Sequence, residues 1–168
     1  MTGVGVIFQE GLKQCTARGF IIRVCLAYLC QLDEQCSADE IRSEFPLAQY
    51  SAQYWMDHAK PAEADKDIQD RILNFLLLQQ QAYAVWGVLF DPDWPRDENP
   101  RTYGRMATPI YYASLAGLLY TVEMLLAKGA NVNAQGGHYG NALQAASAGG
   151  HHEIVQLLLE KGANELRA

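Results

Sequence analysis

Residues 108–168 repeat themselves with a fixed period of 33 residues, and this repeat limits the possible folds more than any other feature. Thr108–Ala113 aligns with Asn141–Ala146, and the alignment continues without a gap. The same offset pairs Gly117 with Gly150, Val122 with Val155, Leu125-Leu126 with Leu158-Leu159, and Gly129–Asn131 with Gly162–Asn164. A period of this size indicates stacked helical units, each of which buries its apolar face only against a neighbour.

Local chemistry predicts two helices in each copy. Thr108 or Asn141 caps the first helix, and Pro109 occupies the first helical position, where its missing N–H costs nothing. Gly117 and Gly150 are predicted to end these helices. The second helices are predicted to end at Gly129 and Gly162 and to carry the apolar faces Thr121, Val122, Met124, Leu125, Leu126 and Ile154, Val155, Leu157, Leu158, Leu159.

The segment between the two copies is predicted to form a projecting hairpin. Residues 135–140 contain three glycines, which permit the positive φ angles that tight turns require.

These motifs resemble the ankyrin repeat, whose pattern runs Thr-Pro-Leu-His-x-Ala, then Gly, then Val-x-x-Leu-Leu, then Gly-Ala-Asp-Val-Asn. In this chain the pattern is carried by Thr108–Tyr111, Gly117, Val122–Leu126 and Gly129–Ala134. The second copy departs from it, because Asn141-Ala142 stands in place of Thr-Pro. The resemblance implies two ankyrin repeats, 108–140 and 141–168.

The resemblance also implies that partner proteins dock on the hairpin and on the first helix of each copy, without any chemistry. The residues predicted to contact a partner are Gln135, His138, Tyr139, Ser114, Leu115, Ser147, Ala148 and His151. No cofactor, metal or small-molecule substrate is expected.

Two repeats are few for a stable stack, so the N-terminal half is predicted to cover the first copy. At the other end three possibilities stay open. The outer face of the second copy tolerates exposure, or it meets another chain, or the chain is a shortened relative of a longer array.

Residues 1–90 are predicted to be helical and bundle-like. Ser37–Glu40 has the form of a capping box, and its helix should stop near Phe45, because Pro46 starts a new one. Pro61 is predicted to open a further helix with an acidic first turn. The predicted apolar stripes are Phe20, Val24, Ala27, Tyr28 and Cys30–Leu32; then Leu47, Tyr50, Tyr54, Trp55 and His58; then Ile68, Ile72, Leu73, Phe75 and Leu76.

Residues 91–107 are predicted to form a solvated linker, since three prolines lie within Asp91–Pro100. Its carboxylates lack the Gly and the distal Glu of a calcium loop.

A second resemblance concerns the first ninety residues. Phe45–Ala59, Cys25–Leu29 and Ala84–Pro92 are similar to segments of the connecting region of fungal NACHT–ankyrin proteins. The phosphate loop Gly-x-x-x-x-Gly-Lys-Ser/Thr does not occur in the sequence, so nucleotide binding is not carried over.

The charge distribution and the cysteines limit the classes of partner and the cellular compartment that we expect. Residues 1–100 hold 8 basic and 15 acidic side chains, whereas residues 101–168 hold 5 and 4. Because no basic stripe exists, direct binding to nucleic acid or to an anionic membrane is not expected. The four cysteines form no Cys-x-x-Cys pair, so the sequence gives little support to a zinc site or a thioredoxin-like site. A reduced intracellular location, cytoplasmic or nuclear, is the default expectation.

An enzyme is the least favoured interpretation. The four histidines and four cysteines lack metal-ligand spacing, and a Cys36/His58 dyad has no local support. We therefore predict a non-enzymatic protein–protein interaction module, an adaptor or regulatory protein. The alternatives are an ankyrin-type transcriptional co-regulator, by family analogy alone, and a truncated NACHT–ankyrin paralogue that modulates a full-length relative.

Overall fold

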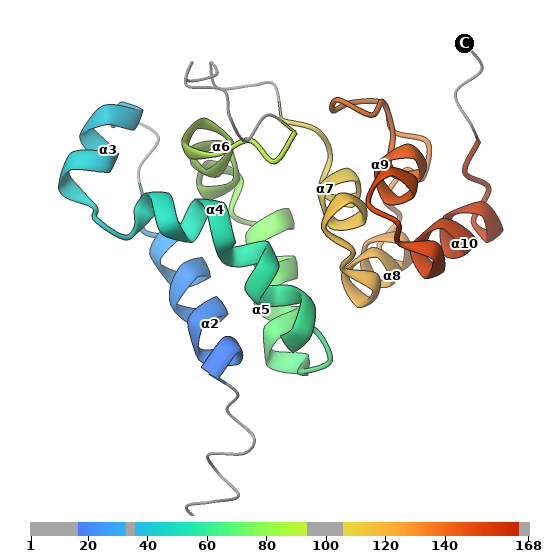
Figure 1. Cartoon of the computed structure of the whole chain (residues 1–168), viewed down its shortest axis with the longest axis horizontal. Helices are drawn as coiled ribbons and strands as arrows, with labels where there is room; N and C mark the ends of the chain where they lie inside the picture. The colour runs from blue at the N-terminus through green and yellow to red at the C-terminus, as the bar shows by residue number, and fades with distance from the viewer. Residues whose placement is uncertain (1–16, 33–35, 94–105, 165–168) are drawn as a thin grey trace, which may run out of the picture.

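The computed structural model describes residues 17–32, 36–93 and 106–164. These residues form helices and no β-strand, with one isolated antiparallel bridge between Gln135 and Asn141 (Figure 1). The fold is all-α, as the sequence predicts.

The N-terminal half is a helical bundle. Its elements are α2 (Ala17–Leu29), α3 (Ala38–Glu44), α4 (Ala48–Ala59), the 3₁₀ turn η1 (Lys60–Ala62), α5 (Lys66–Leu77) and α6 (Gln80–Leu89). Helix α2 packs along α4 and also contacts α5. The predicted capping box is confirmed, because the Ser37 side chain accepts from the Glu40 N–H and the Glu40 carboxylate accepts from the Ser37 N–H.

Two of the predicted apolar stripes lie on the wrong side of their helices. In α2 the buried residues are Gly19, Ile22, Cys25, Leu26 and Leu29, while Phe20 is 61% exposed. In α4 the side that meets α2 carries small residues such as Ala48 and Ala52, which let the two helices approach closely. Tyr50 and Tyr54 are therefore exposed, and of that stripe only Trp55 is buried.

Aromatic side chains fill the centre of the bundle. Trp55, Phe75 and Trp86 pack edge to face, with Trp55 and Trp86 ring centroids 5.4 Å apart. The Trp86 indole N–H donates to the Ala52 carbonyl at 2.9 Å, which satisfies its polar atom inside the core.

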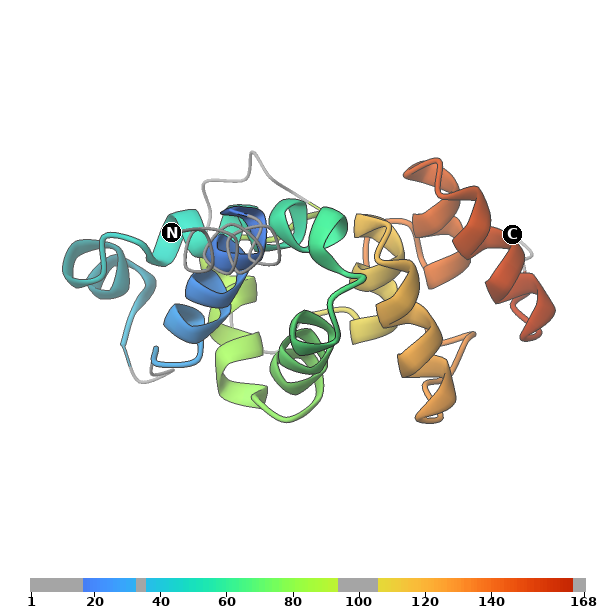
Figure 2. The same ribbon diagram turned by 90° about the horizontal axis from the view of Figure 1, so that it is seen from below.

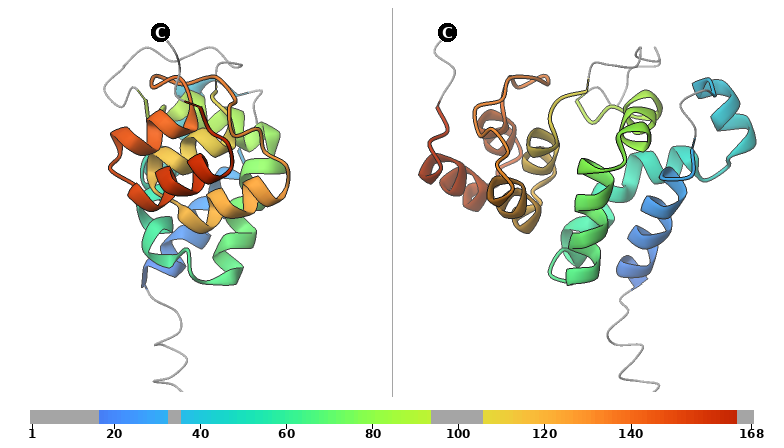
Figure 3. Two further views of the ribbon diagram at one scale, coloured as in Figure 1. Left: turned by 90° about the vertical axis from the view of Figure 1, so that its right-hand side faces the viewer. Right: turned by 180° about the vertical axis from the view of Figure 1, so that it is seen from behind.

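The C-terminal half consists of two stacked helix pairs. They are α7 (Pro109–Ala116) with α8 (Leu119–Ala127), and α9 (Ala142–Ala148) with α10 (His152–Glu160). Helix α7 lies beside α9 and α8 beside α10. Figure 2 shows the two pairs side by side at one end of the molecule and the bundle at the other, and the view from behind in Figure 3 agrees.

The caps and turns of the repeats follow the local prediction with one exception. Gly117, Gly129, Gly150 and Gly162 all have positive φ angles just after their helices. The Asn141 side chain accepts from the Gln144 N–H at 2.9 Å. Thr108 stands at the cap position of α7, but in the described structure its side chain makes no capping hydrogen bond.

The apolar faces of α8 and α10 are partly as predicted. Thr121, Val122 and Leu125 are buried in α8, and Ile154 and Leu158 in α10. Met124 and Leu159, also predicted for these faces, are 39% and 51% exposed.

The bundle covers the first repeat, as predicted. Helix α5 packs against α8, and the Trp86 ring meets the Tyr112 ring at a centroid distance of 5.1 Å. The Tyr83 hydroxyl donates to the Ala107 carbonyl at 2.8 Å, just before α7. The aromatic core thus continues from one half of the molecule into the other.

Within the described residues, no single helix is long and apolar enough to cross a membrane. Helices α5 and α6 together pass that test by length and composition, but they are bent by 85° relative to each other.

Candidate protein-binding surface

The hairpin between the two repeats forms as the glycines predict. The Gly136 N–H donates to the Gly140 carbonyl at 2.8 Å, and Gly137 and Gly140 have φ angles of 75° and 91°. At its tip, His138 and Tyr139 are exposed, with ring centroids 5.0 Å apart. The tip therefore presents a tyrosine, a residue type that is enriched at protein interfaces, beside an imidazole ring.

The carboxylate of Asp93 holds this tip in place from the segment after α6. Its Oδ1 accepts from the Tyr111 hydroxyl at 2.5 Å, and its Oδ2 accepts from the His138 N–H at 2.9 Å. The Tyr111 hydroxyl in turn accepts from the Tyr139 N–H at 3.2 Å. Burial, followed by the bond to Asp93, raises the pKa of Tyr111, so the phenol stays protonated and keeps donating.

This arrangement corrects the prediction of a wholly solvated linker. Asp91 is buried and Asp93 is half-buried against the repeats. The remainder of that segment, 94–105, lies outside the described residues.

Gly137 is required where the tip passes over Tyr111. A Cβ atom on Gly137 would lie 2.1 Å from Cζ of the Tyr111 ring, and its φ angle of 75° disfavours any other residue. The tip and the ring thus pack in direct contact.

The predicted contact residues on the first helices divide between surface and core. In α9, Ser147 and Ala148 are exposed, and the Ser147 hydroxyl donates to the Leu143 carbonyl at 2.8 Å. In α7, Ser114 is 0% exposed, and Leu115 is half-buried and packs against the core. A side chain buried in this way cannot contact a partner in this structure, so the prediction for Ser114 is corrected.

His151 has a structural position rather than a projecting one. Its Nε2 lies 3.0 Å from the Leu115 carbonyl, and its ring fills the space above Gly117 and Gly149. Burial is the largest cause that lowers the pKa of His151, and nearby Lys60 and His152 act in the same direction. His151 also borders a shallow hollow of about 400 Å³ that includes Lys60 and His152.

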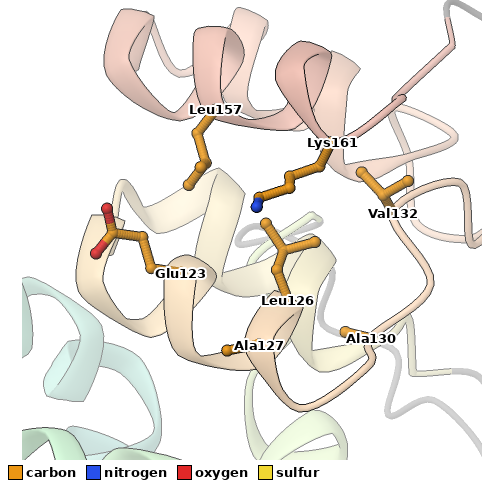
Figure 4. A pocket seen from close by; sticks show the side chains of 7 residues that line it. All are labelled: Glu123, Leu126, Ala127, Ala130, Val132, Leu157 and Lys161. Atoms are coloured by element: carbon orange, nitrogen blue, oxygen red, sulfur yellow. The ribbon is translucent and has the colours of Figure 1, made fainter.

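A groove that the sequence does not predict lies between α8 and α10 (Figure 4). Its volume is about 440 Å³, and it is lined by Glu123, Leu126, Ala127, Ala130, Val132, Leu157 and Lys161. The repeat pattern places Leu126 and Leu157 on the predicted apolar faces of these two helices. Both are only partly buried.

His58, one member of the Cys36/His58 pair weighed in the sequence, contacts a tyrosine in the structure. The His58 Nε2 lies 2.8 Å from the Tyr50 hydroxyl, on the exposed side of α4. Among the residues that the structure describes, no group of three or more His, Cys, Asp or Glu side chains is placed to hold a metal ion.

Comparison with known proteins agrees with the repeat architecture. The family model "Ankyrin repeats (3 copies)" matches residues 68–167, which takes in α5 and α6 as well as the two helix pairs. The azaphilone pigments biosynthesis cluster protein L of Monascus ruber is 36% identical over 161 residues, which cover 86% of this chain and 34% of that protein.

A further relative matches over a shorter stretch. The probable E3 ubiquitin-protein ligase XBOS33 of Oryza sativa subsp. japonica is 40% identical over 67 residues, which cover 40% of this chain and 13% of that protein. The chain thus spans about a third or less of the length of these relatives. No solved structure matches it significantly.

The family match covers more than half of the sequence, and its residues fold into stacked helix pairs joined by a hairpin. Ankyrin repeats are protein–protein interaction modules and are generally not enzymes. The chain belongs to the ankyrin-repeat family.

Proposed function

We propose that this chain is a non-enzymatic adaptor or regulatory protein that binds a partner protein through the hairpin tip and the exposed part of α9. The observation that carries the proposal is the exposed His138–Tyr139 ring pair on a backbone held by Asp93. A tip held in this way loses little conformational freedom on binding, so more of the contact energy appears as affinity. Gln135, Ser147 and Ala148 are also exposed, and we include them in the proposed contact surface.

The experiment compares two exposed tyrosines on different faces. Tyr139, at the tip, is 38% exposed, and Tyr120, on α8, is 46% exposed. Partners that co-purify with the whole chain are identified by cross-linking and mass spectrometry, and their Kd values are then measured with purified protein. Tyr139→Ala is expected to weaken binding about tenfold or more, as loss of an aromatic anchor does. Tyr120→Ala serves as the matched control and should leave binding unchanged.

Both variants should keep the thermal midpoint of the parent chain, because neither residue is in the core. If the Tyr139→Ala variant binds every partner with the same affinity as the parent, the hairpin tip is not a contact surface. An intracellular location, cytoplasmic or nuclear, forms part of the proposal and is checked by imaging the tagged chain.

A second candidate function is modulation of a longer relative. It is favoured by the match to the Monascus ruber protein, which involves 86% of this chain and only 34% of that protein. A chain that shares one segment of a larger protein can compete for the partner of that segment. Displacement of the longer protein from its partner by this chain, measured in solution, tests the idea. The NACHT–ankyrin resemblance of residues 1–90 stays a prediction.

A further inference from the structure

Helix α2 carries an apolar stripe on its solvent side, although it lies on the outside of the bundle (Figure 3). Phe20 is 61% exposed and Val24 is 38% exposed, and Ala17 and Ala27 are exposed as well. These four residues, the α2 stripe, follow one another at intervals of three, four and three, so they share one side of the helix, opposite to its buried residues. A helix that is apolar on both sides is expected inside a structure rather than at its surface.

The charges around the α2 stripe favour an uncharged occupant. The stripe itself contains no ionisable side chain. On the neighbouring side of the helix, Arg23 donates to Asp67 at 2.7 Å and to Asp65 at 3.2 Å, and Arg71 donates to the same Asp67 at 2.9 Å. These two cations and two anions neutralise one another, so they neither attract a charged partner nor repel a second group of the same composition. The surface therefore fits another apolar helix.

The order of the residues in the α2 stripe points to a second copy of this chain as that helix. Read backwards, the intervals are again three, four and three, and the alanines again stand at the ends with the two larger side chains between them. When two copies of α2 lie antiparallel across a twofold axis, Phe20 of each copy faces Val24 of the other, and Ala17 faces Ala27. The small end residues let the two helices approach while the larger side chains interlock at the centre. An interface in which one surface meets itself needs this symmetry, whereas an unrelated partner does not.

The area of the α2 stripe sets the strength of the contact. Aromatic side chains bury about 150–250 Å² each, so Phe20 at 61% exposure offers about 100 Å² or more in each copy. Two stripes of four residues bury less than the roughly 1,200 Å² at which specific, stable interfaces begin, which places the contact in the transient class.

We propose that this chain forms a transient, symmetric dimer through the α2 stripe, with the two α2 helices antiparallel. The bundle and the repeats lie at opposite ends of the molecule (Figure 2), so both hairpin tips stay accessible in the dimer. The dimer is a property beyond the function proposed above and does not depend on it. Where a target carries two binding sites, a dimer binds more tightly than a monomer without any new contact.

Sedimentation equilibrium of the whole chain, from micromolar to near-millimolar concentration, measures the dimer. Phe20→Glu places a carboxylate at the centre of the contact and should raise the dimer Kd about a hundredfold or more, because the twofold axis introduces the change twice. The matched control is Leu78→Glu, which makes a similar change at a residue just after α5 that is 74% exposed. It should leave the Kd unchanged. Both variants should keep the circular dichroism of the parent, since both side chains face solvent.

Mixing two variants tests the antiparallel arrangement. Phe20→Glu and Val24→Lys should each be monomeric when alone. An equimolar mixture should regain dimers, because the introduced carboxylate of one chain then faces the introduced ammonium of the other. In a parallel pair Phe20 would face Phe20, and the mixture would stay monomeric.

Three outcomes would overturn the proposal. The first is a parent chain that stays monomeric throughout the concentration range, which would mean that the stripe has another occupant. The others are a dimer that Phe20→Glu does not weaken and a mixture of the two variants that does not recover. Tyr139→Ala should leave the dimer Kd unchanged, so this proposal and the hairpin function can fail independently.

Discussion

Glu63 is the residue that most directly joins the two halves of the molecule. It is 4% exposed, and its Oε1 accepts from the Thr121 N–H at 2.6 Å. Thr121 lies in the first turn of α8, whose own cap residue, Leu118, has no side chain able to accept a hydrogen bond. The carboxylate from the bundle therefore performs the capping task for a helix of the first repeat.

Removal of this cap should destabilise the whole chain. Glu63→Ala leaves the buried Thr121 N–H without its acceptor, which costs about 1–3 kcal/mol. Urea unfolding at pH 7 measures the change. Glu63→Gln keeps a carbonyl oxygen in position and should retain most of the stability, so equal losses in the two variants would contradict the capping role.

Glu63 should also make the free energy of unfolding depend on pH. Burial is the largest cause that raises the pKa of Glu63, although hydrogen bonds from Thr121 and Tyr120 oppose it. The folded state therefore binds this proton more tightly than the unfolded chain does. The stability that it contributes is present below the unfolded pKa and is lost as the pH rises through the higher folded pKa. In unfolding free energies measured from pH 4 to pH 8, this contribution should disappear in Glu63→Gln.

Asp93 makes a comparable contact at the hairpin tip. Asp93→Ala should increase the hydrogen-exchange rate of the His138 amide about tenfold or more, because a hydrogen bond to a charged acceptor is worth about 1.5–3 kcal/mol. Asp57→Ala, at an exposed position of α4, is the control and should leave that rate unchanged. Equal exchange rates in the Asp93→Ala variant and the parent would show that the tip is rigid without this carboxylate.

At the scale of helices, the two repeats use the same pattern in different surroundings. Ser114 is fully buried, whereas its counterpart Ser147 is exposed. Leu118 is 0% exposed, whereas His151 at the equivalent position is half-buried. The bundle and the second repeat cover the first repeat on both sides. Among the described residues, no element covers the side of the second repeat on which Ser147 is exposed.

The packing of α10 can be tested with two adjacent leucines. Leu158 is 0% exposed and Leu159 is 51% exposed. Leu158→Ala should cost about 2–5 kcal/mol through the lost burial and the cavity that remains. Leu159→Ala should change stability by no more than about 0.5 kcal/mol, the usual effect of a surface substitution. Unfolding of both variants in urea, side by side, checks whether α10 packs through the face described here.

The sequence predicted the repeats more accurately than the bundle, and packing explains the difference. The 33-residue offset and the glycines define each repeat locally, so α7 to α10 and the hairpin lie where predicted. In α4 the small and the aromatic residues each form a helical stripe, and only contact with α2 decides which one is buried. Hydropathy favoured the aromatic stripe, and close helix packing favoured the alanines.

The candidate site was predictable only in part for a related reason. His138 and Tyr139 follow from the glycine-rich hairpin, but Asp93 lies 45 residues away in a segment with no regular pattern. The groove at Leu126 and Leu157 depends on how far α8 and α10 stand apart, which no local motif encodes.

On the scale of the whole molecule, the two halves form one continuous structure. Trp86 packs on Tyr112, Tyr83 bonds to the Ala107 carbonyl, and Glu63 caps α8. The first repeat thus has a covering partner on each side, which explains how so short a stack can be stable.

This continuity predicts one cooperative unfolding transition. The three tryptophans, at positions 55, 86 and 94, precede the two C-terminal helix pairs, and Trp55 and Trp86 lie in the core of the bundle, so fluorescence reports mainly the bundle, whereas far-ultraviolet circular dichroism reports every helix. The two signals should give the same midpoint in urea. A circular-dichroism transition that begins at lower urea would mean that the repeats melt independently of the bundle.

The contrast between Leu118 and His151 means that the two repeats are not interchangeable. In a rearranged gene that encoded them in reverse order, an imidazole would stand at a fully buried position, and a leucine would stand at a half-buried one, where it could not replace the contact of His151 with the Leu115 carbonyl. The duplicated units have therefore diverged into an inner and an outer member, and their succession along the polypeptide is fixed by side-chain chemistry.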